Sequence, residues 1–322
     1  QTGGTSGADI NVMPLWDAGY TGSRDIVVAV IDTGVDYTHP DLRANMWVNA
    51  GEVPDNGLDD DGNGFVDDVY GYDFYNGDGD PRDDDDHGTH CAGTIGGVGD
   101  NAIGVAGVNW NVRIMALKFL GVDGGFTMDA ISCIEYAVQM GAHISNNSWG
   151  GYGYSNALYD ACRKALAAGH LLVCAASNDG LDNDGAWPAY PASYDLANIL
   201  AVAATDHNDE MAWFSNYGAT TVDVGAPGVN ILSAAPGGGY QYMSGTSMAT
   251  PHVTGMAALL KSRFPNATAL DLKEVIMAGA TPVASLTGKT VTGGRVNVQE
   301  SADILAARDM VLCLRGNGLV RD

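Results

Sequence analysis

The sequence predicts an α/β protein built on an open, mostly parallel sheet with helices on both faces. Short runs of β-branched and other apolar residues recur along the chain, without the alternation of apolar and polar residues expected of a strand with one wet face. Between them lie segments whose apolar residues repeat at helical spacing. Strands that alternate with helices in this way are typical of a parallel sheet between two helical layers.

The expected elements follow from these patterns. Strands buried on both faces are expected over 25–32, 113–120, 143–149, 170–176 and 199–205. Helices are expected over 128–140 and 156–168, the second ended by Gly169, and over 253–264, with Pro251 in its first turn. In such sheets ligands bind beyond the carboxyl ends of the strands. Asp32, the segment 146–148 and the segment 177–179 are therefore the first candidates for a site.

Length and charge narrow the class of protein. The chain has 322 residues, 46% of them hydrophobic, with no long linker and no internal repeat, so we expect a single domain over 1–322. Fifteen Lys and Arg against 39 Asp and Glu give a net charge of −24, which disfavours nucleic acid and anionic membranes as partners. The acidic excess is concentrated between Asp55 and Asp86, where Arg82 is the only basic residue.

The remaining global features suggest a soluble, processed form. No apolar run approaches the roughly 20 residues needed to cross a bilayer, and the sequence begins at Gln1 without a Met or a signal segment. The five cysteines are odd in number and lack C-x-x-C spacing, which argues against zinc. Their pairing stays open: Cys133 with Cys162 is one possibility, and Cys91 is the best candidate for a free thiol.

Two short motifs carry candidate catalytic side chains. Ser247, in Gly245-Thr-Ser-Met-Ala-Thr-Pro-His252, should lie at a helix N-terminus, where free N–H groups favour developing negative charge, although serine is also a common helix cap. The segment His87-Gly-Thr-His-Cys-Ala-Gly-Thr-Ile95 offers His87 or His90 as a base. A serine hydroxyl needs such a base, and the base needs a carboxylate to orient it.

The set of motifs resembles the subtilisin-like serine proteases. Val30-Ile-Asp-Thr-Gly-Val-Asp36 with His39-Pro-Asp41, then HGTHCAGT, then GTSMATPHV match the three catalytic blocks of that family in its order. The resemblance implies a three-layer subtilisin-like fold and an Asp32, His87 and Ser247 triad, with His90 left to helix packing. It covers residues 10–305 and leaves 306–322 as an extension of unknown role. It further implies a secreted endopeptidase, made as a zymogen with an N-terminal propeptide and acting as a monomer.

The same resemblance assigns the residues around the reacting bond. Asn178 matches the amide that helps to hold the oxyanion, although the family more often has Gly where Ser177 stands. An extended polypeptide substrate is expected to pair with main chain on two edges of a cleft. The residues implied in substrate binding are Gly124, Gly125, Ser148, Trp149, Gly150, Ala175, Ala176 and Ser177. The preferred side chain before the cleaved bond stays open, and acidic residues at 179, 182 and 184 suit a basic one.

The acidic segment suggests a first calcium site. Asp59-Asp-Asp61-Gly-Asn63-Gly64 has the D-x-D-x-N-G spacing in which alternate oxygens converge on one ion. The twelfth position is Tyr70 rather than Glu, so the motif is not an EF-hand. The closing carboxylate is then expected from Asp67 or Asp68; the alternative is a solvated acidic loop.

A second calcium site is implied by the resemblance alone. Asp41 and the loop 99–105 are similar to the calcium loop of the family. The expected ligands are Asp41, Asn101, the carbonyls of Gly99, Ile103 and Val105, and Gln1. The run 83–86 beside His87 is expected to be a solvated face; the alternatives are a further ion site, or negative charge that raises the pKa of the histidine.

Three other functions fit less well. An α/β-hydrolase esterase also has a motif close to Gly245-Thr-Ser-Met-Ala249, but in that fold the Asp and His follow the Ser. A catalytically silent calcium-binding or adhesive module would be expected to lack one catalytic residue, and none is missing. A dinucleotide-binding enzyme would have G-x-G-x-x-G after the first strand, and this motif is absent.

Overall fold

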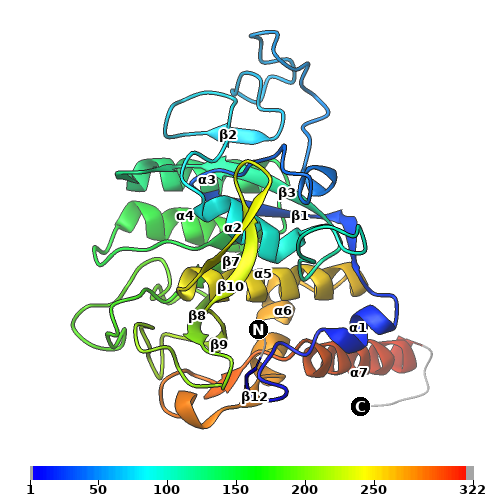
Figure 1. The fold of residues 1–322 in the computed structure, drawn as a ribbon, viewed down its shortest axis with the longest axis vertical. Coiled ribbons are helices and arrows are strands. Elements are labelled where there is room, and N and C mark those ends of the chain that lie inside the picture. Colours follow the sequence, from blue (N-terminus) through cyan, green and yellow to red (C-terminus); the bar gives the residue numbers. More distant parts are fainter. Residues whose placement is uncertain (1–2, 317–322) are drawn as a thin grey trace.

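The computed structural model describes residues 3–316 and has a nine-stranded sheet at its centre (Figure 1). The strand order is β12-β13-β9-β8-β7-β6-β1-β3-β2, and every neighbouring pair is parallel except β12 with β13. In that order the strands are Thr281–Pro282, Gly294–Arg295, Val224–Pro227, Ile199–Thr205, Leu171–Ala175, Ile144–Asn147, Gly22–Asp32, Asn111–Lys118 and Gly71–Asp73. The predicted parallel α/β sheet is confirmed.

Helices and two small hairpins complete the chain. The helices are α1 (Met13–Asp17), α2 (His87–Gly96), α3 (Thr127–Gln139), α4 (Asn156–Ala167), α5 (Thr246–Arg263), α6 (Ala269–Ala278) and α7 (Val298–Gly316), with 3-10 turns η1 (Arg43–Asn45) and η2 (Ala284–Leu286). The hairpins are β4 (Leu120–Gly121) with β5 (Gly124–Gly125), and β10 (Ile231–Ala235) with β11 (Gly239–Met243).

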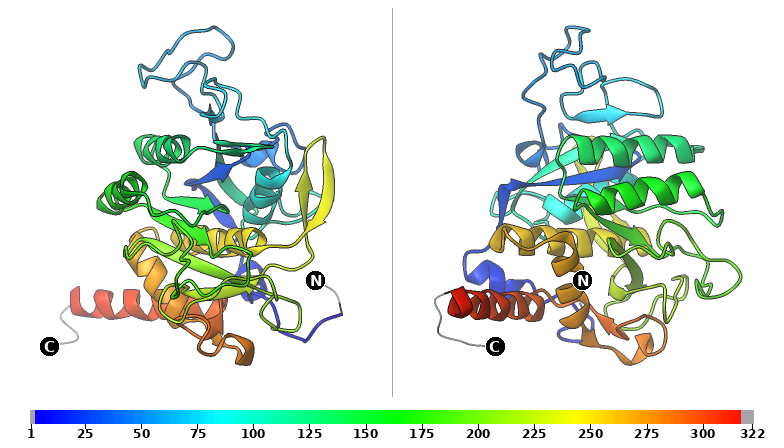
Figure 2. Two further views of the ribbon diagram at one scale, coloured as in Figure 1. Left: turned by 90° about the vertical axis from the view of Figure 1, so that its left-hand side faces the viewer. Right: turned by 180° about the vertical axis from the view of Figure 1, so that it is seen from behind.

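The sheet separates two hydrophobic cores, as the alternation of side chains along β1 illustrates. Val28 and Val30 pack on one face with residues of α2 and α5, whereas Ala29 and Ile31 pack on the other with residues of α3 and α4. All four side chains are fully buried. Figure 2 shows the resulting three layers edge-on. Burial on both faces is why these strands are continuous apolar runs in the sequence.

The helix that follows Gly245 is longer than predicted. Its apolar stripe was expected over 253–264, with Pro251 in the first turn and Ser247 at the N-terminus; α5 begins at Thr246, which agrees with the place of Ser247, and Pro251 lies inside the helix rather than in its first turn. The small and polar residues 246–250 gave no apolar periodicity, yet all five are buried against the sheet and α2. Ser247 therefore lies in the first turn of α5.

The other elements agree within a few residues, and two open questions are answered. Gly169 follows α4 in the left-handed region, with φ of 77°, as a helix-terminating glycine does. Cys91, Cys133, Cys162 and Cys174 are free and buried, so the Cys133–Cys162 pair is wrong; Cys313 is outside the residues whose side chains are described. No break occurs at residue 306, because α7 runs through it. Among the described helices none is long and apolar enough to cross a membrane.

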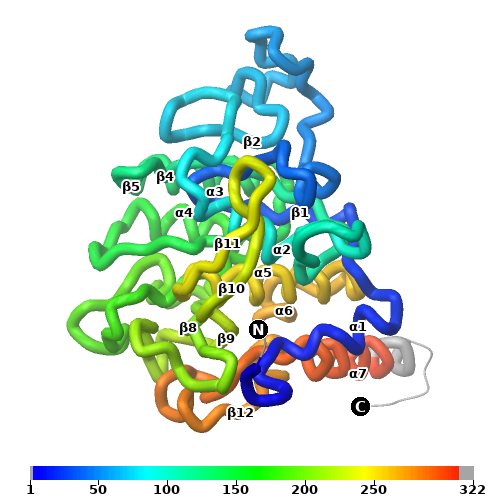
Figure 3. Tube along the Cα trace, in the orientation of Figure 1, coloured from blue at the N-terminus to red at the C-terminus, as the bar shows by residue number. Residues whose placement is uncertain are grey.

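The acidic segment is a separate feature of the outline. Between η1 and β2 the chain leaves the body of the molecule and forms a projecting loop region at one end (Figures 1 and 3). Its main chain has few partners in the sheet, so it depends on its own side chains for order. This region holds seven of the 39 acidic residues, and one of them, Asp68, accepts the hydroxyl of Tyr136 in α3.

Candidate active site

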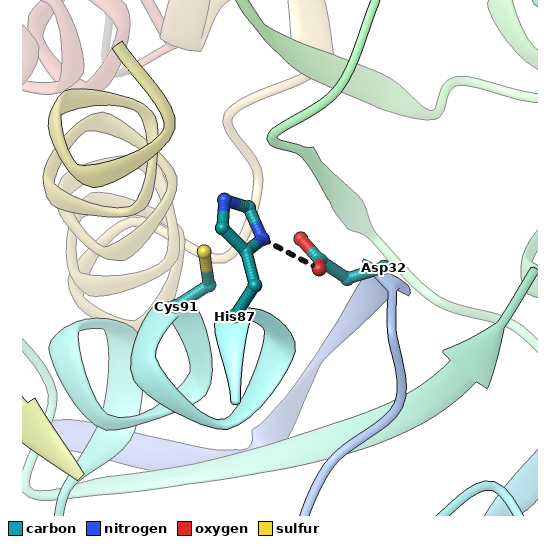
Figure 4. A group of neighbouring side chains, drawn as sticks. All are labelled: Asp32, His87 and Cys91. Carbon is teal, nitrogen blue, oxygen red and sulfur yellow. Dashed lines mark hydrogen bonds and ion pairs between the residues drawn. The ribbon is translucent and has the colours of Figure 1, made fainter. Parts of the chain in front are cut away.

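Asp32 and His87 form a hydrogen-bonded pair at the carboxyl end of β1. Asp32 is the last residue of β1 and is completely buried, and its Oδ1 lies 2.7 Å from the Nδ1 of His87 (Figure 4). Oδ1 also accepts the N–H of Thr33 at 2.8 Å. The imidazole keeps 21% of its surface exposed, so its other nitrogen remains available to an incoming group.

His87 is held in place by the close approach of two chain segments. A Cβ on Gly88 would lie 2.0 Å from the carbonyl oxygen of Gly34, so α2 starts directly against the turn after β1. The hydroxyl of Thr33 accepts the N–H of Gly88 at 2.9 Å and donates to Asp83 at 2.8 Å. The turn after Asp32 thus fixes the helix that carries His87.

The electrostatics around His87 favour its protonated form. Burial disfavours the imidazolium, but the charge and hydrogen bond of Asp32, together with Asp83 and Asp85, outweigh it and raise the pKa of His87 to about 9. This value lies above the ordinary value near 6.5, so protonation of His87 stabilises the fold, and the effect is lost as the pH rises toward about 9. The run 83–86, expected to be only a solvated face, therefore influences the base.

The second histidine of the motif has a structural role. His90 is fully buried, and its Nε2 lies 2.9 Å from the carbonyl oxygen of Ile231 in the hairpin that packs on α2. Burial lowers its pKa. The structure therefore places His90 in the packing of α2, as the resemblance implied, and leaves His87 as the candidate base.

Cys91 is an additional group beside this pair. It lies one turn after His87 on α2, next to the imidazole (Figure 4). The ligating atoms of Asp32, His87 and Cys91 are all within 4.8 Å of one another. Burial raises the pKa of the Cys91 thiol well above its ordinary value, so it is a neutral thiol at the site.

Ser247 lies in the first turn of α5, and its carbonyl oxygen is 3.5 Å from the Sγ of Cys91, the thiol beside His87. Its side chain is 8% exposed, and its hydroxyl donates to the carbonyl oxygen of Ser148 at 3.0 Å. Within residues 3–316 no hydrogen bond joins this hydroxyl to His87. The main-chain N–H of Ser247 belongs to the first helical turn, where N–H groups have no intrahelical partner.

Asn178 is oriented toward the same place. Its Oδ1 accepts the N–H and the hydroxyl of Thr246 at 2.8 and 3.0 Å, which leaves its Nδ2 without a hydrogen bond to any described residue. A Cβ on Gly245 would lie 3.5 Å from the Ser247 nitrogen and 3.6 Å from Asn178 Nδ2. Two N–H donors therefore border one small volume beside Gly245.

The predicted substrate-binding residues lie on segments bordering these groups. Gly124 and Gly125 form the exposed strand β5, and Gly150 is exposed beyond β6. The indole of Trp149 packs edge-on against Phe119 with ring centroids 4.9 Å apart, so it belongs to the core rather than to an open surface. The segment 148–150 therefore offers a ligand its main chain rather than the Trp149 side chain.

The backbone after β7 accounts for the glycine that the family more often has where Ser177 stands. Ala175 and Ala176 are buried, and Ser177 has φ of 92°, a conformation that favours glycine. Asp179 accepts hydrogen bonds from the hydroxyls of Tyr152 and Ser177. Of the other two acidic residues considered for specificity, Asp184 accepts three hydrogen bonds from Thr220 and Thr221, and Asp182 accepts the N–H of Asp184.

The acidic lobe, residues 49–68, brings together a carboxylate cluster that differs in part from the predicted one. Oxygens of Glu52, Asp61 and Asp68 lie within 4.8 Å of one another, and Asp68 is fully buried. Asn63 lies among them, with its Nδ2 2.8 Å from Asp68 and 3.3 Å from Asp61. The sequence analysis did not include Glu52, because this residue lies seven positions before the D-x-D-x-N-G motif that begins at Asp59.

Two predicted ligands of this lobe bind main chain instead. Asp59 accepts N–H groups of Gly62, Asn63 and Gly64, and Asp67 accepts those of Asn56 and Gly57. These bonds shape the loops on either side of the cluster. The structure therefore separates the carboxylates into a group that converges and a group that orders the loop.

The second predicted calcium loop is organised around a buried carboxylate. Asp41 is completely buried and accepts Asn101 Nδ2 at 2.6 Å and the N–H of Val105 at 2.9 Å. Gly99 lies against the indole of Trp110, and the side chain of Ile103 is exposed. Gln1, the remaining predicted ligand, is outside the described residues.

Comparisons with known proteins agree with this geometry. The family model described as the subtilase family matches residues 23–301. The chain is 41% identical to a thermophilic serine proteinase of Bacillus sp. (strain AK1), over 88% of this chain and 62% of that protein. It is 36% identical to subtilisin-like protease 1 of Plasmodium vivax, over 86% of this chain and 47% of that protein, so it spans less than two thirds of either relative.

Other similar proteins are matched over most of their length. Subtilisin BL of Lederbergia lenta is 40% identical over 83% of this chain and 87% of its own. Among solved structures, a protease from Pseudoalteromonas arctica superposes with a TM-score of 0.76 at 29% identity, over 93% of this chain and 95% of that one. The three-layer fold and these matches show that the chain belongs to the subtilase family.

Proposed function

We propose that the protein is a serine endopeptidase that hydrolyses peptide bonds through an acyl-enzyme. The observation that carries this proposal is the hydrogen-bonded pair of buried Asp32 and partly exposed His87, with Ser247 at the start of α5 in contact with Cys91 beside that pair. In this proposal Ser247 is the nucleophile, His87 the general base and then acid, and Asp32 the carboxylate that fixes the imidazole tautomer and stabilises imidazolium.

The reaction requires one side-chain rotation from the arrangement seen. The Ser247 hydroxyl donates to Ser148 and must turn toward the free nitrogen of His87 before it attacks. His87 then takes the hydroxyl proton as the bond from Oγ to the carbonyl carbon forms, and gives it to the leaving amine as the peptide bond breaks. Water then attacks the acyl-enzyme while His87 takes its proton. His87 gives this proton to Ser247 Oγ as the ester bond breaks, which releases the acid and regenerates Ser247.

The oxyanion of the tetrahedral intermediate is proposed to bind the Ser247 N–H and the Asn178 amide. Asn178 is preorganised for this because its oxygen is held by two groups of Thr246, which directs its N–H₂ outward. Donors fixed before the reaction stabilise developing charge without reorganising. The start of α5 adds the favourable end of the helix dipole.

Polypeptides in an extended conformation are the proposed substrates. Exposed main chain of Gly124 and Gly125 in β5, and of Gly150 after β6, supports pairing with a substrate strand, and Ala175–Ser177 is proposed to border the residue before the cleaved bond. The charge of −24 disfavours nucleic acid as a partner. An esterase remains the second candidate, because the same triad hydrolyses esters, and peptide substrates distinguish the two.

Calcium is the proposed cofactor, with a role in stability. The converging carboxylates of Glu52, Asp61 and Asp68 are hard oxygen donors of the kind that calcium prefers, and Asp41 supplies one at the second site. Asn63 and Asn101 direct Nδ2 toward these carboxylates, so each amide must turn over to offer its oxygen to an ion. Carboxylates that converge this closely repel one another without a cation. Asp59 and Asp67 are proposed to shape the first site through the main chain.

Further aspects of the biology follow from the family. We propose that the protein is secreted, because oxygen-ligand sites of modest affinity fill at the millimolar calcium levels found outside cells. We further propose a single peptidase domain, monomeric, matured from a zymogen by loss of a propeptide, to which residues 306–316 contribute the end of α7.

The first prediction tests the nucleophile. Ser247→Ala should lower peptide hydrolysis by several orders of magnitude, since no other hydroxyl replaces Oγ beside His87. Its melting temperature should change little, because the loss of a small polar group at a helix start costs only about 1 kcal/mol. Cleavage of a peptide library and labelling by a serine-directed inhibitor give the readouts, and turnover retained in this variant would sink the assignment.

The second prediction tests the oxyanion donor. Asn178→Leu should lower kcat by about 10²–10³, the range established for a subtilisin when one such donor is removed, with little change in KM. The reason is that the hydrogen bond is strong only to the charged oxygen of the transition state. Steady-state kinetics on one peptide substrate check it; a change confined to KM would instead place Asn178 in substrate binding.

The third prediction concerns pH. Only neutral His87 can accept the proton, so kcat/KM should rise about tenfold per pH unit below a midpoint near the pKa of about 9. Asp85→Asn should move that midpoint to lower pH, because Asp85 is one of the charges that raise this pKa. Asp309→Asn, an equal charge change on the exposed part of α7, is the control. A midpoint near 6.5, or one unmoved by Asp85→Asn, would contradict the analysis.

The fourth prediction concerns calcium. An ion that binds only the folded lobe stabilises by about 2.7 kcal/mol at one hundred times its Kd, so chelation should lower the melting temperature and speed self-digestion. Asp61→Asn should lose part of this calcium dependence. Asp55→Asn, the same charge change at an exposed position of the same lobe, should keep all of it. Equal melting temperatures in chelator and in millimolar calcium, at matched ionic strength, would show that neither site binds.

A further inference from the structure

Pro251 leaves a main-chain acceptor of α5 without its usual donor. Pro251 lies four residues after Ser247 in α5 and has no N–H, so the helical hydrogen bond to the Ser247 carbonyl cannot form. A buried carbonyl without a donor is unfavourable. The Ser148 hydroxyl supplies one at 2.9 Å, and the Cys91 thiol lies 3.5 Å away. Side chains from outside α5 therefore hold the carbonyl of the candidate nucleophile.

Ser148 engages Ser247 through two groups at once. Its hydroxyl donates to the Ser247 carbonyl, and its own carbonyl accepts the Ser247 hydroxyl at 3.0 Å. Ser148 is 4% exposed, so water does not compete freely for either bond. Any displacement of Ser148 therefore changes the position of both the main chain and the hydroxyl of Ser247.

A second pair of buried side chains fixes Ser148. Asn146, two residues earlier and on the same side of the chain, donates from Nδ2 to the Ser148 hydroxyl at 2.9 Å. The Oδ1 of Asn146 accepts the Thr254 hydroxyl of α5 at 3.0 Å. Asn146 and Thr254 are completely buried. A continuous row of hydrogen bonds thus runs from α5, across the end of β6, and back to α5 at Ser247.

We propose that Thr254 and Asn146 are positioning residues that act on Ser247 through Ser148. The inference rests on the proposed role of Ser247 as nucleophile. Neither Thr254 nor Asn146 reaches the reacting groups, but together they hold the one hydroxyl that replaces the donor removed by Pro251. Without the Thr254 hydroxyl, the buried amide oxygen of Asn146 loses its hydrogen-bond donor. The amide group then shifts toward another hydrogen-bond donor, because an unsatisfied buried oxygen is costly. That shift passes through Ser148 to the nucleophile.

The chain offers a matched control one turn earlier in the same helix. Thr250 is also completely buried, and its hydroxyl donates to the Thr246 carbonyl at 2.8 Å. In the same way, the Thr254 hydroxyl lies 3.1 Å from the Thr250 carbonyl. Both hydroxyls lie within 3.1 Å of the carbonyl four residues before, and the single hydrogen of Thr254 is shared between that carbonyl and Asn146 Oδ1. Only Thr254 also touches Asn146. Thr254→Val and Thr250→Val therefore make the same chemical change with and without loss of the Asn146 contact.

The experiment compares peptide hydrolysis and melting temperature in three variants of the full chain. We expect Thr254→Val to lower kcat about tenfold with KM within about twofold, because alignment of Ser247 affects the chemical step more than substrate binding. Thr250→Val should keep kcat within about twofold, and Thr254→Ser, which restores the hydroxyl, should recover most of the loss. The rate at which a serine-directed phosphonate labels Ser247 should fall in parallel with kcat.

Other outcomes would overturn the inference. Wild-type kcat in Thr254→Val, or an equal fall in Thr250→Val, would show that the row of hydrogen bonds does not position Ser247. If Thr254→Val does not fold, Thr254→Ala against Thr254→Ser makes the same comparison, and equal kcat in these two would reject the proposal. Failure of the proposed function looks different: the wild type would not hydrolyse peptides, or Ser247→Ala would retain the activity.

Discussion

The hydrogen bond between the buried carboxylate of Asp32 and the imidazole of His87 is the interaction on which the rest of the site depends. A carboxylate taken out of water is costly unless charged or N–H groups compensate it. Thr33 and His87 do so at Oδ1, while Oδ2 has no hydrogen-bond partner among residues 3–316. The pair survives only if α2 is docked firmly, which the contact of Gly88 with Gly34 provides. The fixed orientation of the His87 imidazole and its raised pKa are therefore both consequences of the buried Asp32 carboxylate.

The parallel sheet explains how groups far apart in the sequence meet beside this pair. Asp32 ends β1, Ser148 follows β6 and Asn178 follows β7, so one edge of the sheet presents all three. α5 comes later in the chain than these strands, packs against the same sheet and brings Ser247 to that edge. Hydrogen bonds from Thr246 to Asn178 and from Ser148 to Ser247 tie the strand ends to the helix. The nucleophile is thus held by the sheet as well as by its own helix.

The projecting acidic lobe affects the stability of the fold and not the reaction at His87 and Ser247. Its carboxylates lie in loops whose order depends on mutual hydrogen bonds, as between Asn49 and both Asp61 and Asp68. A cation that binds there would stabilise the folded chain without taking part in the reaction. The carboxylates near His87 have the opposite effect, because they tune the base and are not part of a converging cluster. Two acidic segments of similar composition therefore have different physical roles.

Local patterns in the sequence were sufficient for the sheet and the main helices, whereas the three catalytic candidates were assigned by the resemblance of their motifs to a known family. Burial on both faces produces continuous apolar runs, and acyl transfer needs a nucleophile, a base and a carboxylate without fixing their places in the sequence. Apolar periodicity alone did not indicate the start of α5, because residues 246–250 are buried without such a pattern; the expected place of Ser247 at a helix N-terminus did indicate it. Nor was the role of Glu52, which joins Asp61 and Asp68 only when the lobe folds back on itself. The partners of Asn146, Ser148 and Thr254 were hidden for the same reason: hydrogen bonds between segments separated by a hundred residues depend on distance in space, which only the packing of α5 against β6 decides.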